Sequence, residues 1–298
     1  MMLGRRTKFI YQECQNCGCL QIAQFPADIA DYYPSDYYSY NLATKGALKR
    51  WRRGLRRRAY FTDSPLGRLW ISFMSNNQDH IFRIYQRLGV RLNQKILDVG
   101  AGGGTHVVEL REAGVKGAIG LDPYLPQDKY WNDEVLVKKA SLESMRGTFD
   151  LITFHHSLEH MESQLSALQH AKELLGPQGK ILVRIPSVSS LAFERYREFW
   201  FQIDAPRHYF LHSHKSISLV AEQAGLKVTS LWCDSTPMQF IMSEQYKSDV
   251  PLHDPRSFAR NKRTSLFKRS QLDEFKKLTD EVNNSMRGDQ ICVVMEAN

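Results

Sequence analysis

The stretch Ile96-Leu97-Asp98-Val99-Gly100-Ala101-Gly102-Gly103-Gly104-Thr105 decides the fold of this chain. An apolar strand that ends in an acid and a glycine-rich turn is typical of an open α/β sheet. Glycine has no Cβ, so such a turn lets backbone N–H groups approach a ligand closely. A second apolar strand, 118–121, ends in Asp122, and an acid at this place binds a ribose diol. We therefore expect a cofactor that contains adenosine.

The spacing of the glycines distinguishes between cofactors. Gly100 and Gly102 fit the dinucleotide pattern G-x-G-x-x-G, but Thr105 stands at its sixth position. A phosphate-binding P-loop needs Gly-Lys-Ser/Thr, which the chain lacks. The pattern instead resembles the first motif of class I S-adenosylmethionine (SAM) methyltransferases. The resemblance implies SAM as the cofactor, with no phosphate to bind.

Composition sets the broad class of the protein. The chain has 298 residues, 42% of them hydrophobic, which suffices for a sizeable core. No stretch approaches the ~20 apolar residues of a membrane span, and the basic N-terminus lacks the apolar core of a signal peptide. The five cysteines form no disulfide framework, so we expect reduced thiols and a cytoplasmic protein.

Three zones follow one another along the chain. Residues 1–45 form a cysteine- and tyrosine-rich appendage, 46–93 a basic and mostly helical lead-in, and 94–298 the methyltransferase-like domain. In the lead-in, apolar residues recur at helical spacing, and we expect them to face the core. They are Leu66, Leu69, Trp70, Phe73, Met74, Ile81, Ile84, Tyr85 and Leu88.

The alternation of strands and helices after residue 94 predicts an α/β, Rossmann-like fold. We expect a seven-stranded, mostly parallel sheet with helices on both faces and an antiparallel last strand. Helices are expected at 107–113, 164–175, 215–224 and 270–284, the second of them ending at Gly176-Pro177. The strands are expected at 95–99, 118–121, 135–138, 149–154, 180–185, 226–232 and 291–296.

The N-terminal zone contains one half of a zinc ribbon, Cys14-Gln15-Asn16-Cys17-Gly18-Cys19. A second C-x-x-C pair should precede it, but residues 1–13 contain no cysteine. Closed structural zinc sites have four ligands, so we expect a truncated ribbon without metal. The tyrosines that follow either pack or line an acceptor site; they are Tyr32, Tyr33, Tyr37, Tyr38 and Tyr40.

The positive charge of the chain is concentrated in one segment. Residues 49–58 carry seven cations and no acid, which accounts for nearly all of the net charge of +8. Trp51 and Leu55 share one face if the segment is helical. Three interpretations stay open: a solvated helix face, contact with an anionic membrane or a lipid-linked substrate, and binding of nucleic acid.

Ligands of open α/β sheets bind at the carboxyl ends of the strands. The methyltransferase resemblance places the cofactor at the residues that follow the strands, with the adenine edge held by the loop before 149–154. The candidate SAM-binding residues are Asp98, Gly100, Ala101, Gly102, Asp122, Pro123, Ser141, Leu142 and His155.

Two further strings make the resemblance more specific. His155-His156-Ser157-Leu158-Glu159-His160, with Leu174–Lys180 downstream, resembles methyltransferases related to ubiquinone-pathway O-methyltransferases. The run Phe199–His208, with the cysteine turn and the tyrosines, resembles a bacterial subgroup often encoded with surface-glycan biosynthesis enzymes. This likeness covers residues 11–296, although the missing cysteine pair departs from it. It implies a sugar or glycan precursor as the acceptor.

A hydroxyl acceptor needs a base, and histidine suits neutral pH. His156 follows the strand where the methyl group must emerge, and His160 lies at a helix start, where it also fits a structural role. His208 is the third candidate. Its neighbour Arg207 suits a phosphate or carboxylate of the acceptor, or the internal acid Asp204. The chemistry requires no metal.

We therefore expect a SAM-dependent methyltransferase that acts on a small polar acceptor, on oxygen rather than on carbon. The alternatives are an RNA methyltransferase that uses residues 49–58 and a catalytically inactive SAM-binding scaffold. Against the first, His-His-Ser-Leu stands where enzymes that methylate base amino groups have Asn/Asp-Pro-Pro-aromatic. Against the second, the glycines and both acids of the cofactor motif are intact. We expect a cytoplasmic location, with peripheral contact at the inner face of the membrane as an option.

Overall fold

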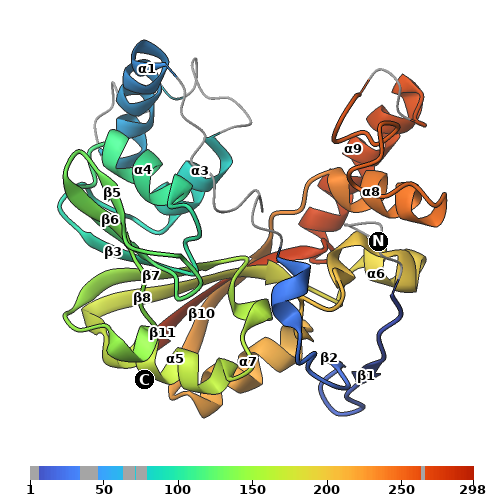
Figure 1. Cartoon of the computed structure of the whole chain (residues 1–298), viewed down its shortest axis with the longest axis horizontal. Helices are drawn as coiled ribbons and strands as arrows, with labels where there is room; N and C mark the ends of the chain where they lie inside the picture. Colours follow the sequence, from blue (N-terminus) through green and yellow to red (C-terminus); the bar gives the residue numbers. More distant parts are fainter. Residues whose placement is uncertain (1–6, 34–45, 63–70, 72–78, 263–265) are drawn as a thin grey trace. The chain divides into compact units, whose positions relative to one another are not determined.

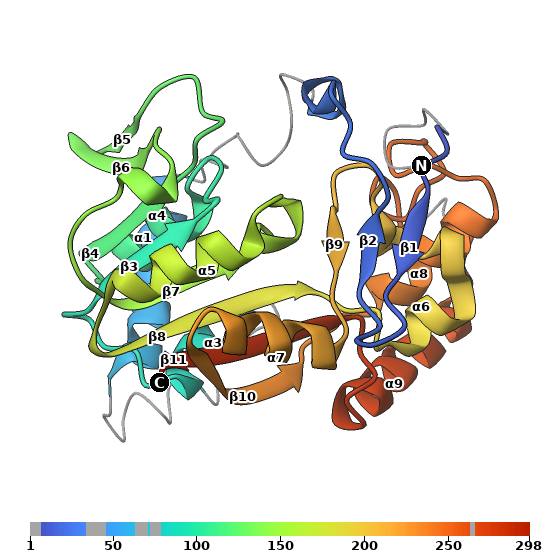
Figure 2. The ribbon, with the colours of Figure 1, turned by 90° about the horizontal axis from the view of Figure 1, so that it is seen from below.

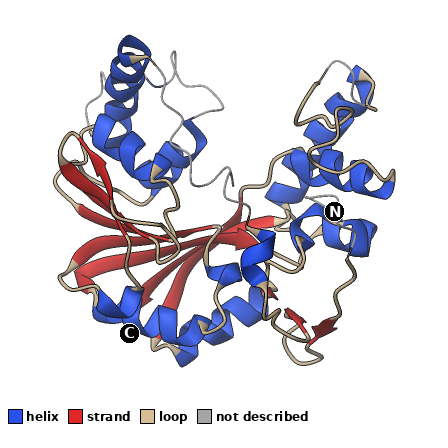
Figure 3. Cartoon of the chain, in the orientation of Figure 1, coloured by secondary structure: helices blue, strands red, loops and turns tan. Residues whose placement is uncertain are grey.

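The computed structural model describes residues 7–33, 46–62, 71, 79–262 and 266–298. The chain divides into two compact units. Unit 1 comprises residues 1–34, 156–172 and 181–298, and unit 2 comprises 35–155 and 173–180. Both units combine helices with strands. Figure 3 shows the helices and strands of the described chain. The helical positions expected at Leu66, Leu69, Trp70, Phe73 and Met74, and the tyrosines 37, 38 and 40, lie outside the described residues.

Unit 2 contains the parallel part of the main sheet. Its apolar strands are buried, as expected for strands that are covered on both faces. β3 pairs in parallel with β4 and β7, and β4 with β6, while β5 pairs antiparallel at the edge. The strands are β3 (Lys95–Val99), β4 (Gly117–Leu121), β5 (Lys129–Trp131), β6 (Glu134–Lys138) and β7 (Phe149–His155).

The helices of unit 2 begin with α1, which lies beside α4 (Figure 1). α4 starts after Gly104, whose φ of 82° favours glycine, and it packs on β4 and β6. The one side of α3 formed by Ile81, Phe82, Ile84 and Tyr85 is buried, as the apolar spacing predicts. The elements are α1 (Ala47–Arg58), η3 (Ala59–Phe61), α3 (His80–Arg87), α4 (Thr105–Glu112) and η5 (Leu142–Ser144).

Unit 1 contains antiparallel strands. β11 (Gln290–Ala297) pairs antiparallel with β10 (Leu226–Cys233) on one side and, on the other, with residues 181–186 of β8 (Leu175–Pro186), the part of that strand that belongs to unit 1. α7 and α9 pack on β10. The helices are η1 (Ile29–Tyr32), η6 (Leu158–His160), α5 (Gln164–Glu173), α6 (Leu191–Tyr196), η7 (Arg197–Phe199), η8 (Phe201–Ile203), α7 (His214–Gln223), α8 (Met238–Lys247) and α9 (Arg269–Asn284).

A second, small sheet in unit 1 joins distant parts of the sequence. β1 (Tyr11–Glu13) and β2 (Leu20–Ile22) form a hairpin around the cysteine turn, and β9 (Phe210–Leu211) adds to β2 (Figure 2). The apolar cluster of the unit includes Leu20 and Leu211 together with Trp200 and Phe240. The N-terminal hairpin therefore belongs to the core of unit 1.

The expected fold class is confirmed: a mostly parallel α/β sheet with helices and an antiparallel final strand, in the order β10-β11-β8-β7-β3-β4-β6-β5. Two details differ from the prediction. The sheet has an eighth strand, β5, and Gly176-Pro177 lies inside β8 rather than in a loop. Proline is tolerated there because pairing with β11 begins only at Ile181, so no ladder hydrogen bond is lost on that side. No helix in the described ranges is long and apolar enough to cross a membrane.

Candidate functional site

The glycine turn of unit 2 is tied to the end of β4 by its own backbone. The N–H groups of Gly100 and Ala101 donate to the carbonyl of Leu121 at 2.8 and 3.1 Å. The N–H of Gly102 donates to Oδ2 of Asp122 at 2.8 Å. Gly100 and Gly102 have φ of 74° and 53°, a region that glycine adopts without strain. These three N–H groups therefore donate within the fold, to the residues at the end of β4.

Asp122 keeps acceptor capacity for a ribose. Its Oδ1 accepts the N–H of Tyr124 at 2.9 Å, so each carboxylate oxygen receives one backbone hydrogen and has a second lone pair. The side chain is buried, and burial raises its pKa although both backbone bonds favour the charged form. A buried carboxylate with spare lone pairs fits a diol. Pro123, beside it, is exposed.

Asp98, on β3, is also buried. Its Oδ1 accepts the hydroxyl of Thr153 at 2.8 Å, which joins β3 to β7. Burial raises the pKa of Asp98 to about 7. Its carboxyl thus supports the strand end from inside the sheet.

Other predicted cofactor residues of unit 2 cluster at strand ends as well. His155 ends β7, and its Nε2 lies 3.0 Å from the hydroxyl of Tyr85 on α3. The ring of His106 on α4 lies 5.1 Å from that of His155. Ser141 precedes η5 and is exposed, whereas Leu142 is buried. Tyr85 and His106 were not predicted as site residues.

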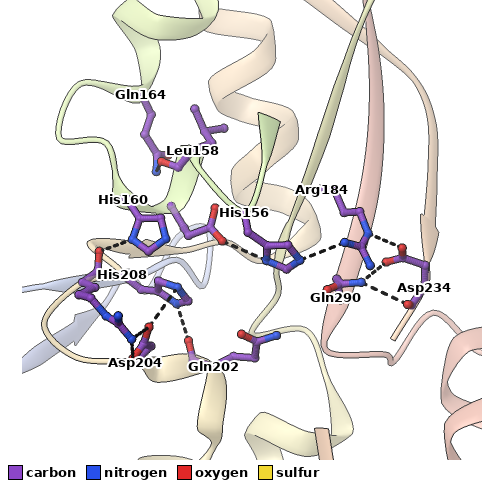
Figure 4. Close-up of polar contacts among 12 residues, drawn as sticks. His156, Leu158, His160, Gln164, Arg184, Gln202, Asp204, His208, Asp234 and Gln290 are labelled. Carbon is purple, nitrogen blue, oxygen red and sulfur yellow. Dashed lines mark hydrogen bonds and ion pairs between the residues drawn. The ribbon is translucent and has the colours of Figure 1, made fainter. Parts of the chain in front are cut away.

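Unit 1 holds a network of polar side chains that includes His156, His160, Arg184 and His208 (Figure 4). Arg184 donates to Nε2 of His156 at 3.2 Å, and arginine can only donate. The proton of His156 therefore sits on Nδ1, which faces Oε1 of Glu159 at 3.3 Å. Both ring nitrogens of His156 thus have a partner, and the two contacts fix the orientation of the ring.

Glu159 is fully buried, and within the described part of the chain its carboxylate oxygens have no hydrogen bond beyond this contact with His156. Burial works against its charge. The hydrogen bond from His156 and the nearby rings of His160 and His208 outweigh that penalty and lower the pKa of Glu159 to about 2. The Glu159 carboxylate is thus a buried negative charge close to His156, His160 and His208.

His160 and His208 share one arrangement. Nδ1 of His160 donates to the carbonyl of Arg207 at 2.8 Å, and Nδ1 of His208 donates to the carbonyl of Gln202 at 2.6 Å. Each Nε2 therefore carries a lone pair when the ring is neutral. Burial lowers the pKa of both rings to about 4, so they are neutral at pH 7. The centroids of the two rings are 4.7 Å apart, and Figure 4 shows the rings beside each other.

Among the described residues, Glu159, His160 and His208 form the group that could bind a metal cation. Ligand atoms of Glu159, His160 and His208 lie within 4.8 Å of one another. Two imidazoles and a carboxylate are ligands of first-row divalent metals. The sequence predicted no metal for this site.

Arg207 binds the internal acid. Its guanidinium makes two bonds of 2.6 Å to Asp204, and it lies 5.7 Å from the ring of Tyr33. The hydroxyl of Tyr33 contacts Nδ1 of His160 at 3.2 Å. Of the two options that the sequence left open for Arg207, the structure contains the pairing with Asp204.

The cysteine turn is a tight hairpin end. Cys14 N–H donates to the carbonyl of Cys19, and Gly18 N–H to that of Cys14, with φ of 69° at Gly18. The three thiols are free. Ser213, at the start of α7, donates to the carbonyl of Cys17, which anchors the turn to unit 1.

The basic segment forms α1, and its arginines bind acids within unit 2. Arg53 and Arg57 contact Glu109 at 3.6 and 2.8 Å, and Arg57 contacts Asp79 at 3.0 Å. Arg50 and Arg53 also contact Glu112, and Arg56 contacts Asp79. Four of the seven cations are therefore neutralised internally, which removes much of the support for binding of nucleic acid.

We expect the free energy of unfolding to decrease as the pH falls from 6.5 to 4. His160, His208 and His212 have a pKa of about 4 in the fold because of burial, against 6.5 in an unfolded chain. In that window the unfolded state binds protons that the folded state does not, so stability decreases as pH falls, by on the order of several kcal/mol. Burial also raises the pKa of Asp98 to about 7 and that of Asp289 to about 6, and it raises the pKa of Asp122 and Asp204. These four carboxyls act in the opposite direction and offset part of the loss.

Melting temperatures measured from pH 8 to 4.5 check this. His208→Gln, whose amide can still donate to the carbonyl of Gln202, should reduce the pH slope. A melting temperature that stays constant from pH 7 to 5, or an unaltered slope in this variant, contradicts the prediction.

Comparison with known proteins gives one family. A family model described as "Methyltransferase domain" matches residues 73–231. No curated protein matches the chain.

Several solved structures resemble the chain at low identity. A SAM-dependent methyltransferase from Archaeoglobus fulgidus is 14% identical (TM-score 0.46, covering 76% of this chain and 97% of that one). A cyclopropane synthase from Mycobacterium tuberculosis is 15% identical (TM-score 0.46, 89% and 99%). A magnesium protoporphyrin IX methyltransferase from Synechocystis, with bound S-adenosylhomocysteine (SAH), is 16% identical (TM-score 0.41, 70% and 92%).

Proposed function

The chain belongs to the family of methyltransferase domains, and from this premise we propose that it methylates a hydroxyl of a sugar or glycan precursor. It is a SAM-dependent methyltransferase. The observation that carries the proposal is the pair His160 and His208, each with its Nδ1–H held by a backbone carbonyl and a lone pair on Nε2. A neutral, oriented imidazole is the base that a hydroxyl acceptor requires.

The residues proposed to hold SAM are those of unit 2. Asp122 suits the ribose diol with its remaining lone pairs, and the turn at Gly100–Gly102 presents no side chain beyond the Ala101 methyl. Asp98 supports this edge from below, while Leu142 and Ser141 are proposed for the adenine and His155 for the region of the methyl group. When bound, SAM supplies a methyl group that its sulfonium charge already activates. The chain's own contribution is then largely positioning, for which ~7–11 kcal/mol of barrier is available.

The proposed roles of the three histidines differ. Nε2 of His208 takes the proton of the acceptor hydroxyl, and His160 is the second candidate for that step. His156, held between Arg184 and Glu159, positions Glu159 beneath them. Glu159 stabilises the imidazolium that forms, because its pKa of about 2 keeps it ionised. No metal enters this scheme.

The remaining parts of the chain complete the proposal. Residues 1–45 are proposed as a half-zinc-ribbon-like, tyrosine-rich segment, 46–93 as a lead-in and 94–298 as the domain that carries the chemistry. Glycan precursors are often carried on lipids, so we include peripheral contact of residues 49–58 with the inner face of the membrane of a cytoplasmic protein. An RNA substrate is the alternative that the paired arginines of α1 disfavour.

The test is an acceptor screen with SAM that carries an isotope-labelled methyl group. Nucleotide sugars, lipid-linked glycans and RNA are offered separately, and SAH release and the labelled product are measured. A labelled methyl ether on a sugar supports the proposal, and a methyl group on sugar carbon corrects the atom. Label in RNA alone overturns it. SAH binding without turnover on any acceptor favours the inactive scaffold.

A further inference from the structure

The helix α1 turns its charges inward and its apolar side chains outward. Arg50, Arg53 and Arg57 lie on the side that contacts Glu109, Glu112 and Asp79. On this side Gly54 passes so close to the backbone of Glu112 that a Cβ would lie 2.4 Å from its carbonyl oxygen. The ion pairs and the close approach fix which side of α1 faces unit 2.

The opposite side is apolar and exposed. Leu48, Trp51 and Leu55 are 62%, 64% and 52% exposed, and their spacing of three and four residues places them on one face. They are three of the few large apolar side chains with such exposure in the described chain. Globular helices arrange these two faces the other way round.

Cations flank this apolar face. Lys49 and Arg52 are exposed, and among the described residues neither forms an ion pair. Arg58 is exposed as well, but its guanidinium lies against Gly114. The helix contains no acid. We call Leu48, Trp51 and Leu55, with Lys49 and Arg52, the outer face of α1.

We propose that the outer face of α1 docks on an anionic lipid bilayer, with Trp51 and the two leucines inserted at the interface. This inference rests on the proposed function only for its purpose, since a lipid-linked acceptor would lie at the same surface. Tryptophan and leucine enter the interfacial region, and flanking lysine and arginine bind anionic headgroups.

Other occupants fit this face less well. A specific protein interface buries about 800 Å² on each partner, which three side chains on one helix do not supply. A nucleic acid requires clustered free cations, whereas the arginines of α1 are mostly paired and the centre of the outer face is apolar. An anionic bilayer matches both the apolar centre and the cationic flanks.

The mode of binding has a measurable signature. Each free cation near an anionic surface is worth about fivefold in affinity at low salt, since ~1 kcal/mol per residue corresponds to that factor. Salt screens this part and leaves the insertion of the apolar side chains largely intact. Binding should therefore weaken with salt without disappearing.

The experiment is co-sedimentation of the full chain with vesicles of phosphatidylcholine alone or mixed with phosphatidylglycerol. We expect binding to the mixed vesicles that survives in part at high salt. The triple variant Leu48→Gln, Trp51→Gln and Leu55→Gln should lose it by at least about tenfold; glutamine retains the helix. The matched control, Ile10→Gln, Tyr130→Gln and Leu266→Gln, removes equally exposed apolar side chains elsewhere and should bind like the wild type. A second variant, Lys49→Gln with Arg52→Gln, should lose only the salt-dependent part.

Calorimetric binding of SAH by each variant shows that it is folded, and it separates this inference from the proposed function. If the wild type does not bind SAH, the proposed function is contradicted, whereas the result with vesicles still tests this inference. The inference is overturned if the wild type ignores mixed vesicles, if the triple variant binds as well as the control, or if RNA displaces the protein from them.

Discussion

Asp122→Asn should weaken binding of SAH by about 100-fold or more while the chain stays folded. The variant loses the negative charge that suits two ribose hydroxyls, and hydrogen bonds to a charged group are worth ~1.5–3 kcal/mol each. In the wild type the N–H groups of Gly102 and Tyr124 donate to the two carboxylate oxygens of Asp122. In the variant the NH₂ group of asparagine replaces one of these oxygens and therefore faces another donor. Both effects act on the same edge of unit 2. Calorimetric titration with SAH measures the loss.

The control is Asp133→Asn, the same chemical change at an exposed residue of unit 2, where φ of 63° is one that asparagine tolerates. It should bind SAH like the wild type. The melting temperature of each variant separates a lost ligand contact from a lost fold. Unchanged affinity in folded Asp122→Asn would remove Asp122 from the cofactor site.

His208→Ala should reduce methyl transfer by about 10²- to 10⁴-fold and leave SAH binding unchanged, because a positioned base contributes that much to a proton transfer. The pH profile gives a second readout. Since burial lowers the pKa of His208 to about 4, the base stays unprotonated down to that pH, and the wild type should keep its turnover at pH 5.5. An ordinary histidine would already lose most of it there. SAH release measures both.

His253→Ala, at an exposed histidine, is the control. Two further variants separate the proposed roles. His160→Ala tests whether His160 can act as the base, and His156→Ala tests whether His156 positions Glu159. A His208→Ala enzyme with wild-type turnover and an unchanged pH profile would assign the proton transfer elsewhere. Wild-type turnover that falls with a midpoint near pH 6.5 would contradict the lowered pKa of the base.

The main sheet could be predicted because its signals are local. Runs of apolar residues that end in Asp98, Asp122 and His155 mark three parallel strands, and each of these strands lies within two residues of its expected ends. The edge strand β5 was missed because Lys129–Trp131 has three residues and no apolar run. Pro177 suggested a loop, since sequence alone does not show which part of a strand is paired.

The polar network of unit 1 could be predicted only in part. The histidines stood out as residues, but their tautomers depend on carbonyl groups at Gln202 and Arg207 that no pattern places there. Arg184 carried one usable signal, a single charge within an apolar strand, because such a charge needs a buried partner. That partner is Asp234, at 2.5 Å, and it lies fifty positions away in the sequence.

The direction of α1 could not be predicted for a similar reason. Its sequence reads as a cationic helix, and the acids that bind its arginines belong to α4 and to Asp79. Charge counting gives the number of cations in residues 49–58. Only the partners decide which of them face water.

The small sheet of unit 1 also sets an order of events during synthesis. The hairpin β1–β2 leaves the ribosome early, but its third strand, β9, follows roughly 190 residues later, which takes about 10–40 s at ~5–20 residues per second. The edge of β2 stays unpaired for that interval, whereas the thiol of Cys14 is exposed even in the folded chain. The carbonyl of His208, which accepts the hydroxyl of Tyr11 at 2.8 Å, waits for the same closure. The histidine pair is therefore assembled after every strand of unit 2 has been made, and the nascent chain has its cofactor edge well before its base.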